Sequence, residues 1–526
     1  MEILYFADNG SVRGCKLSRL ANSVRNIKFG TVGLILSFIS SFIARKVFVV
    51  FLSVEYLGLS GLFTNILSML SLAELGVGLA ISYNLYKPLA FNETQQIQAL
   101  MKLYRNVYFI IGSFILTIGL ALTPFLHFLM KEVPDIPHLY LIYWLYLINS
   151  ASSYFLGYKR TVLIADQKKY IDSIYIFGFQ ILRHLVQILV LILTRSFILF
   201  LGVMFFITIS ENMAISIKVN SLYPYLKGKI DASLTRNEKK EIRKNIFALS
   251  FHKVGSVLVN GTDNILLVKF VGLASAGLYA NYTMIRVATN KIIRIIYSSI
   301  TASIGNLSAE KQAVGSKPVF DQLNFISAWV YGFTTLCLLF LYNPFISLWL
   351  GDKYLFPQSI VFVITLNYYL QGMRNPVLTF KNSLGLFWYD RYKPLFESAI
   401  NLLASIILAR KFGIVGVLLG TSISTVTTCF WIEPYVVFRF GFGMPLSQYF
   451  SKYLKYTLVT ILAGLATFGC LTFVTFLNPF INLLVAMLIC AIVPNIVYLL
   501  FFHRLKEFKE TLIVLKRILH GRKNPL

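Results

Sequence analysis

The hydrophobic pattern of the chain is a series of long apolar runs separated by short polar segments. A helix that crosses a bilayer needs about 20 mainly apolar residues. Fourteen runs meet this requirement, so the pattern predicts an all-α polytopic membrane protein with 14 transmembrane helices. The predicted spans are 29–52, 57–86, 106–130, 138–157, 171–194, 197–218, 247–269, 274–305, 322–349, 357–379, 393–410, 413–438, 454–477 and 480–502.

Composition supports this interpretation and excludes several classes of protein. The chain is 57% hydrophobic and 13% charged, whereas soluble domains carry about 25% charged residues. A soluble enzyme, a secreted repeat protein and a disordered scaffold are therefore excluded. The five cysteines show no CxxC spacing and no clustering with His, so neither a metal site nor a disulfide framework is expected. The polar first 28 residues lack a cleavage motif and predict a cytoplasmic arm, not a secretory signal.

The distribution of basic residues predicts the orientation. With the N-terminus inside and the spans alternating, 35 of the 49 Lys and Arg fall on the cytoplasmic side, six fall outside and eight lie within spans. This asymmetry is typical of cytoplasmic loops and places both termini inside. Most of the net charge of +27 therefore reflects topology, and no nucleic-acid partner is expected.

Two sequence matches indicate an internal duplication. YLGLSGLFTN (Tyr56–Asn65) resembles FVGLASAGLYAN (Phe270–Asn281), and IADQKKY (Ile164–Tyr170) resembles FWYDRYK (Phe387–Lys393). Six spans separate the equivalent positions, so the two halves are expected to be parallel repeats, with substrate bound between them. The predicted organisation is an arm (1–28), an N-lobe (29–218), a basic linker (219–246), a C-lobe (247–440), two further spans (441–502) and a basic cytoplasmic tail (503–526).

The tail has an amphipathic pattern. Phe508 and Leu512 begin an apolar stripe at helical spacing that runs between basic residues such as Lys506 and Lys509. This pattern fits a helix lying on an anionic membrane surface, or an ordinary polar tail.

Charged and polar side chains inside the spans are the best pointers to function, because a charge at the bilayer centre costs at least ~2.5–3.5 kcal/mol. Several groups fall on single helix faces, among them Ser37, Ser41 and Arg45 at four-residue spacing. The candidates for substrate binding are Arg45, Arg183, Arg286, Asn290, Lys291, Arg294, Gln371 and Arg374. The candidates for coupling or gating are Glu74, His184, His252 and Asp263.

The balance of these charges predicts an anionic substrate. Eight interior cations, counting Lys46 and Lys253 with the six above, exceed three interior acids, Glu74, Glu211 and Asp263, by five. Arginine suits phosphate because its planar fork binds two oxygens at once. Other interpretations stay open. Several of the cations lie near span ends, where their side chains can reach the membrane–water interface. Glu74 can pair with Arg45, and the histidines can be buried hydrogen-bonding groups.

The stretches EYLGLSGLFTNILSMLSLAELGVGLAISYNLYKPLA (Glu55–Ala90) and SSYFLGYKRTVLIADQKKYI (Ser152–Ile171) resemble the Wzx-type polysaccharide repeat-unit flippases of the MOP exporter superfamily. The resemblance implies two six-helix lobes in a V around a central cavity, with two additional C-terminal helices. It implies transfer of undecaprenyl-diphosphate-linked oligosaccharide to the outer leaflet of a bacterial plasma membrane. It also implies cavity cations, for which Arg45 and Arg286 are the best matches.

Two further classes of function remain. A MATE-like exporter of small molecules shares the expected architecture, and a membrane-embedded glycan polymerase or ligase is a third possibility, although every predicted outside loop is short. The sequence has no Walker loop, HExxH motif or nucleophile elbow, so a non-enzymatic carrier is expected. No cofactor is expected beyond coupling to H⁺, Na⁺ or the membrane potential. The expected partners are the lipid-linked glycan, the bilayer, and polysaccharide polymerase and assembly proteins.

Overall fold

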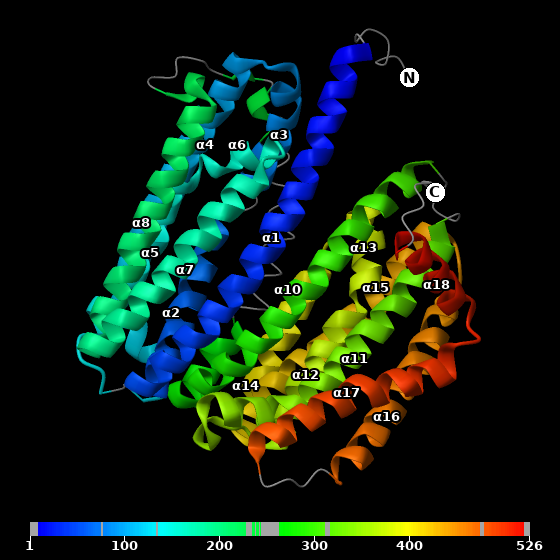
Figure 1. Ribbon diagram of the computed structural model, residues 1–526. Coiled ribbons are helices and arrows are strands. Elements are labelled where there is room, and N and C mark those ends of the chain that lie inside the picture. Colours follow the sequence, from blue (N-terminus) through cyan, green and yellow to red (C-terminus); the bar gives the residue numbers. More distant parts are fainter. Residues whose placement is uncertain are drawn as a thin grey trace. The chain divides into compact units, whose positions relative to one another are not determined.

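The structure is a computed structural model that describes residues 9–74, 77–132, 135–227, 234–236, 238–240, 242, 262–310, 316–473 and 478–519. Over these residues every regular element is a helix, as the apolar pattern predicts. The chain divides into two compact units, Met1–Gly261 (unit 1) and Thr262–Leu526 (unit 2). Figure 1 shows the long helices of each unit.

Unit 1 is a helical bundle in which α1 lies along α7, α7 packs on α8, and α5 packs on both α4 and α8. Its short helix α6 contacts α3, α7 and α8. The helices are α1 (Asn9–Phe51), α2 (Val54–Leu70), α3 (Val77–Phe91), α4 (Thr94–Leu122), α5 (Leu139–Gly157), α6 (Arg160–Ala165), α7 (Lys169–Thr194) and α8 (Phe197–Leu222), with 3₁₀ turns η1 (Ser71–Glu74), η2 (Thr123–Leu129) and η3 (Pro224–Leu226).

Unit 2 is built around α11, which contacts α12, α13, α16, α17 and α18. Residues 262–270 form a further helical segment before α10. The elements are α10 (Leu273–Glu310), α11 (Lys317–Leu350), α12 (Gln358–Met373), α13 (Asn375–Ser383), α14 (Lys393–Ser424), α15 (Phe430–Val436), α16 (Ser447–Leu471), α17 (Pro479–Phe502) and α18 (Lys506–Leu519), with 3₁₀ turns η5 (Asp352–Tyr354) and η6 (Leu386–Trp388) and π turns η7 (Thr425–Cys429) and η8 (Val437–Phe442).

Eight helical stretches of the described chain are long and apolar enough to cross a membrane, so this is a multi-pass membrane protein. They are Lys28–Phe51, Thr94–Leu129, Lys169–Thr194, Phe197–Leu222, Lys317–Leu350, Lys393–Phe442, Ser447–Leu471 and Pro479–Phe502. The count of fourteen stays a prediction. Span 57–86 is divided between α2 and α3, span 357–379 is divided between α12 and α13, and most of span 247–269 lies outside the described residues.

The helix α14 reverses direction next to the loop that the sequence predicts between spans 393–410 and 413–438. Gly413 has φ 55° and ψ −128°, a left-handed conformation that favours glycine. The segments before and after it pack on each other, because Ser405 Oγ donates to the carbonyl of Val417 at 3.1 Å. A Cβ at Gly420 would collide with Ser405. The separate spans predicted at 393–410 and 413–438 therefore correspond to two packed helical segments.

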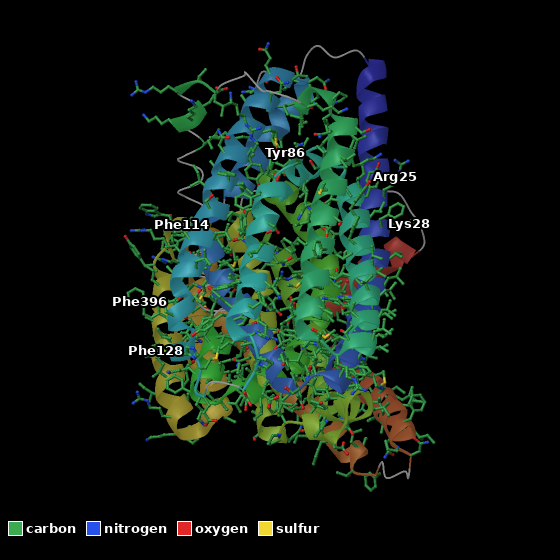
Figure 2. All side chains as sticks on the ribbon, turned by 90° about the vertical axis from the view of Figure 1, so that its left-hand side faces the viewer. Arg25, Lys28, Tyr86, Phe114, Phe128 and Phe396 are labelled. Carbon is green, nitrogen blue, oxygen red and sulfur yellow. The ribbon has the colours of Figure 1, made fainter. Side chains whose placement is uncertain are left out.

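Apolar side chains cover the outside of both units, as lipid contact requires. Phe114, Phe128 and Phe396 point outward in Figure 2 and are 47%, 72% and 64% exposed. Arg25 and Lys28, also labelled there, precede the apolar part of α1. Most of the polar groups considered below are buried or half-buried within the units.

Candidate functional site

In unit 1, α1 places Arg45 half-buried beside α5. Tyr146 of α5 lies within electrostatic range of the guanidinium. The ion pairs formed between described residues of this unit do not include Arg45. Its positive charge is therefore not compensated by an acidic side chain in this part of the chain.

Glu74 ends the 3₁₀ turn that interrupts the predicted span 57–86. Tyr108 of α4 donates to Glu74 Oε1 at 2.6 Å, and the ring of Tyr104 packs against Tyr108 with centroids 4.2 Å apart. A Cβ at Gly78 would lie 3.0 Å from the same carboxylate oxygen, so the glycine lets α3 pass close to it. The pairing of Glu74 with Arg45 that the sequence left open does not occur between these described side chains.

Three charged residues of unit 1 form a compact group that the sequence pattern did not single out as a site. Arg160 of α6 pairs with Asp172 of α7 at 3.3 Å and with Glu211 of α8 at 2.5 Å. Its Nη2 also donates to Asn212 at 3.0 Å. We call Arg160, Asp172 and Glu211 the Arg160 cluster. The single guanidinium group of Arg160 links α6 to both α7 and α8.

Two predicted residues lie on α7, the helix that carries Asp172 of this cluster. Arg183 is within electrostatic range of Glu211. His184 Nδ1 and Ser40 Oγ of α1 lie 2.8 Å apart, a hydrogen bond that links α1 to α7. His184 is thus a hydrogen-bonded interhelical group, and Arg183 has an acid nearby.

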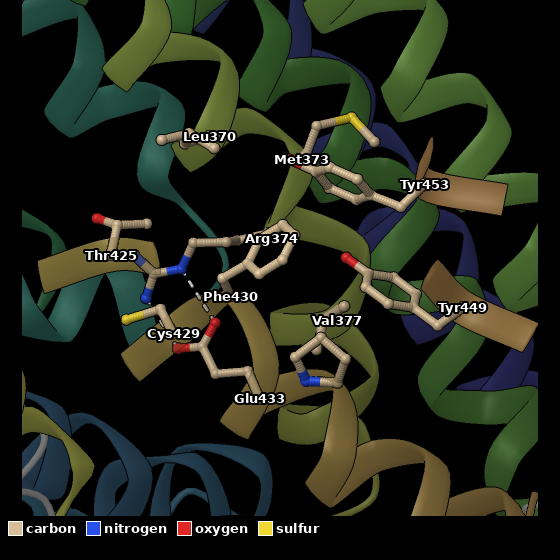
Figure 3. A pocket seen from close by; sticks show the side chains of 11 residues that line it. Leu370, Met373, Arg374, Val377, Thr425, Cys429, Phe430, Glu433, Tyr449 and Tyr453 are labelled. Atoms are coloured by element: carbon tan, nitrogen blue, oxygen red, sulfur yellow. Dashed lines mark hydrogen bonds and ion pairs between the residues drawn. The ribbon is translucent and has the colours of Figure 1, made fainter. Parts of the chain in front are cut away.

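In unit 2, Arg374 lies in a second buried group of charges. Its Nε and Nη2 donate to the two carboxylate oxygens of Glu433 at 3.0 and 2.8 Å (Figure 3). Lys393 Nζ donates to Glu433 at 2.6 Å and to Glu397 at 3.1 Å. Arg374 Nη1 lies 3.6 Å from Glu397. We call these four residues the Glu433 cluster.

The Glu433 cluster is electrically balanced and leaves little space. Two cations face two acids, and the Glu433 side chain is only 1% exposed. The adjoining pocket in Figure 3, lined among others by Cys429 and Tyr449, has a volume of about 10 Å³, enough for about one water molecule. Arg374 is therefore compensated, and this pocket is too small for a sugar.

The count of interior charges left out residues of both signs. Glu397 and Glu433 lie within predicted spans and were not counted among the interior acids, and Asp172 lies within span 171–194. Lys218, Lys393 and Lys455 also lie within predicted spans and were likewise not counted, so the uncounted acids do not lower the predicted excess of cations. The excess of positive charge still applies to the cations that form no ion pair with an acidic side chain of the described residues. Arg45 and Arg286 are the foremost of these cations.

Arg286 lies half-buried on α10 beside an acid and several tyrosines. Asp263, Tyr279, Tyr342 and Tyr368 are within electrostatic range of it. Its Nε is buried and has no hydrogen-bond partner in the described part of the chain. A buried donor without a partner is costly unless a ligand or water satisfies it. This is the feature expected of a cation that receives an anionic group.

Asp263 stands at the end of a chain of oxygen-bearing side chains. Thr421 Oγ1 lies 3.3 and 3.2 Å from its two carboxylate oxygens. Asn401 Nδ2 donates to Thr421 at 3.0 Å, and Thr262 Oγ1 donates to Asn401 Oδ1 at 3.4 Å. Carboxylate, hydroxyl and amide oxygens are the ligands of hard cations. The same carboxylate could instead carry a proton.

The remaining candidates are dispersed. On α10, Asn290 is half-buried, whereas Lys291 and Arg294 are exposed, and on α12 Gln371 is half-buried. His252 lies outside the described residues. Unit 1 thus holds Arg45, Glu74, Arg183 and His184, and unit 2 brings Asp263 and Arg286 together and places Arg374 in the Glu433 cluster.

The two ionic clusters occupy corresponding places in the two units. Asp172 follows the IADQKKY segment and Glu397 follows FWYDRYK, 225 positions later. Glu211 and Glu433 are 222 positions apart, and in each unit a basic residue joins the two acids. The earlier sequence matches have offsets of 216 and 224. The offsets of the acids are close to those of the sequence matches, and the internal duplication stays a prediction.

Comparison with known proteins identifies the fold. Protein-family models give no match, and neither do curated proteins. Among solved structures, the lipid II flippase MurJ in an inward closed conformation matches with a TM-score of 0.64 and 16% identity, covering 90% of this chain and 99% of MurJ. An inward-facing multidrug resistance MATE family transporter of the MOP superfamily matches with a TM-score of 0.59 and 13% identity, covering 78% of this chain and 98% of the transporter. The chain therefore has the all-α fold shared by these membrane proteins.

Proposed function

We propose that this protein is a flippase that moves undecaprenyl-diphosphate-linked oligosaccharide repeat units from the inner to the outer leaflet of the bacterial plasma membrane, for synthesis of a surface polysaccharide such as capsule, O-antigen or exopolysaccharide. The observation that carries the proposal is the pair of arginines, Arg45 and Arg286, that lie within the helical units of a fold also found in a lipid II flippase and have no described acidic ion pair. The likeness covers almost the whole of both chains.

The chemistry of the substrate fits these groups. A sugar headgroup cannot cross hydrocarbon unaided, because its hydroxyls would lose their hydrogen bonds. A diphosphate offers oxygens that two guanidinium groups can bind in bidentate fashion. Alternating access of a cationic cavity moves the headgroup while the prenyl chain stays in lipid. A membrane potential that is negative inside favours outward movement of an anion by about 2.3 kcal/mol per charge per 100 mV.

A MATE-like exporter of small molecules is the second candidate. The fold likeness to a MATE transporter and two interior acids, Glu74 and Asp263, favour it. A carrier of organic cations would use these acids for its cargo. The neighbouring structures are those of a flippase and transporters, which favours a carrier over a polymerase or ligase.

The decisive experiment is transport by the purified protein in vesicles. We expect fluorescent undecaprenyl-diphosphate oligosaccharide to become accessible to an external quencher faster than in protein-free vesicles, and a lipophilic fluorescent cation to show no such difference. Transport of the cation without movement of the diphosphate lipid would favour the exporter and overturn the flippase.

Asp263 is the best placed coupling residue, because its oxygen-bearing neighbours suit Na⁺ or a proton. We expect Asp263→Asn to abolish acceleration of flipping by an imposed Na⁺ or pH gradient, because the amide can neither carry the proton nor supply the negative charge. Initial rates with and without each gradient are the measurement. A matched Asp352→Asn variant, altered in the turn η5, should keep the wild-type response, and an unchanged response in Asp263→Asn would exclude the coupling role.

A further inference from the structure

The helix α18 is fixed near a membrane surface by its connection to α17. Pro479–Phe502 is the most apolar of the membrane-crossing stretches, with mean hydropathy 2.6. It ends at Phe502, and α18 begins at Lys506. The three intervening residues extend over about 10 Å at most. α18 therefore begins within one or two helix diameters of the point at which α17 leaves the bilayer.

One side of α18 is docked on unit 2. The ring of Phe508 stacks on Trp329 of α11 with centroids 5.8 Å apart and planes 12° apart. Glu507 pairs with Lys452 of α16 at 2.6 Å, and Lys452 also pairs with Asp321 of α11 at 3.1 Å. These contacts fix the rotation of α18 about its axis, and so they decide which residues face away from the protein.

The side turned away from this docked face combines apolar and basic residues. Ile513 is 51% exposed on this side, with Lys506 and Lys509 exposed beside it, and Leu512, one helical turn after Phe508, lies at its edge and is 38% exposed. Lys506 Nζ lies 3.7 Å from the Glu510 carboxylate, and an exposed pair of this kind is weak. An apolar surface flanked by lysines is poorly suited to water. It suits the boundary between headgroups and acyl chains, where the apolar residues are buried and the lysine ammonium groups reach the phosphates.

We propose that this exposed side of α18 is a binding surface for anionic lipid headgroups in the adjacent leaflet. Leu512 and Ile513 enter the acyl boundary, and Lys506 and Lys509 bind headgroup phosphates. Phe508 stacks on Trp329, and tryptophan is a residue type enriched at membrane–water interfaces. The proposal concerns the membrane surface and does not depend on which substrate the protein moves.

Hydrogen exchange of the full-length protein in nanodiscs tests this proposal. Membranes of phosphatidylcholine alone are compared with membranes that also contain phosphatidylglycerol. Each lysine near an anionic surface contributes about a five-fold factor in binding, so we expect the amides of residues 506–519 to exchange at least ~10-fold more slowly with phosphatidylglycerol present. Concentrated salt should remove most of the difference.

The Lys506→Gln/Lys509→Gln variant should lose this dependence on lipid while keeping the Phe508 and Glu507 contacts. A matched Lys353→Gln variant, altered in the η5 turn at the other end of α11, should retain it. Equal exchange in the two membranes, or full lipid dependence in the double variant, would overturn the proposal. In the latter case a protein partner or another region of the chain would account for the protection.

Discussion

The Arg45→Ala/Arg286→Ala variant is expected to flip undecaprenyl-diphosphate oligosaccharide at least about 100-fold more slowly than the wild type. A hydrogen bond to a charged group contributes about 1.5–3 kcal/mol, and the variant removes two guanidinium groups that have no described acidic ion pair. The initial rate of quencher accessibility in vesicles is the measurement. An unchanged rate would exclude the two arginines as diphosphate ligands.

Two comparison variants make this result specific. Arg410→Ala removes an exposed arginine of α14 that lies three residues before the reversal at Gly413, and it should leave the rate unchanged. Arg45→Lys/Arg286→Lys keeps the charge and loses the planar fork, so its rate should fall between the wild type and the double alanine variant. A lysine variant as slow as the alanine variant would indicate that bidentate geometry, and not charge alone, is required.

The Glu433→Gln variant is expected to lower the free energy of unfolding by about 3–5 kcal/mol, because it leaves Arg374 and Lys393 buried with one acid between them. Heating with a thiol-reactive dye suits this measurement, since Cys429 is buried beside Lys393 and reacts once the cluster opens. The apparent melting temperature should fall by several degrees.

Two further variants define the origin of that loss. Glu510→Gln removes a weak surface pair with Lys506, whose nitrogen lies 3.7 Å from the carboxylate, and should change stability by less than about 1 kcal/mol. Lys393→Met in the Glu433→Gln background restores the charge balance and should recover part of the loss, which a double-mutant cycle measures. A Glu433→Gln protein as stable as the wild type would show that the cluster is not a stabilising element.

The sequence predicted the membrane class and the positions of many helices because both depend on local composition. α5, α7 and α11 lie within a few residues of their predicted ranges, and the reversal at Gly413 falls at the first residue of the predicted span 413–438. The break of span 57–86 at Ser71–Glu74 could not be placed, because a 3₁₀ turn within an apolar run leaves its hydropathy unchanged.

The ionic clusters were missed for a different reason. Helical spacing indicates which residues share a face, but it does not tell which other helix supplies the partner. Glu433 comes after the π turn Thr425–Cys429, which inserts an additional residue and rotates the next helical turns by about 100° relative to an α-helix. A 3.6-residue period therefore assigns Glu433 to the wrong face. The signal that was available was the presence of two acids, Glu397 and Glu433, inside predicted spans.

The order of charges in the Glu433 cluster has a consequence for synthesis of the protein in the cell. Arg374 and Lys393 are made before Glu433. Until residue 433 leaves the ribosome, the two cations of the cluster have a single acidic partner, Glu397. Between the synthesis of residues 397 and 433 the cluster therefore has one more positive than negative charge. Its charge balance waits for the arrival of α15, when α16, α17 and α18 of unit 2 are still to be made.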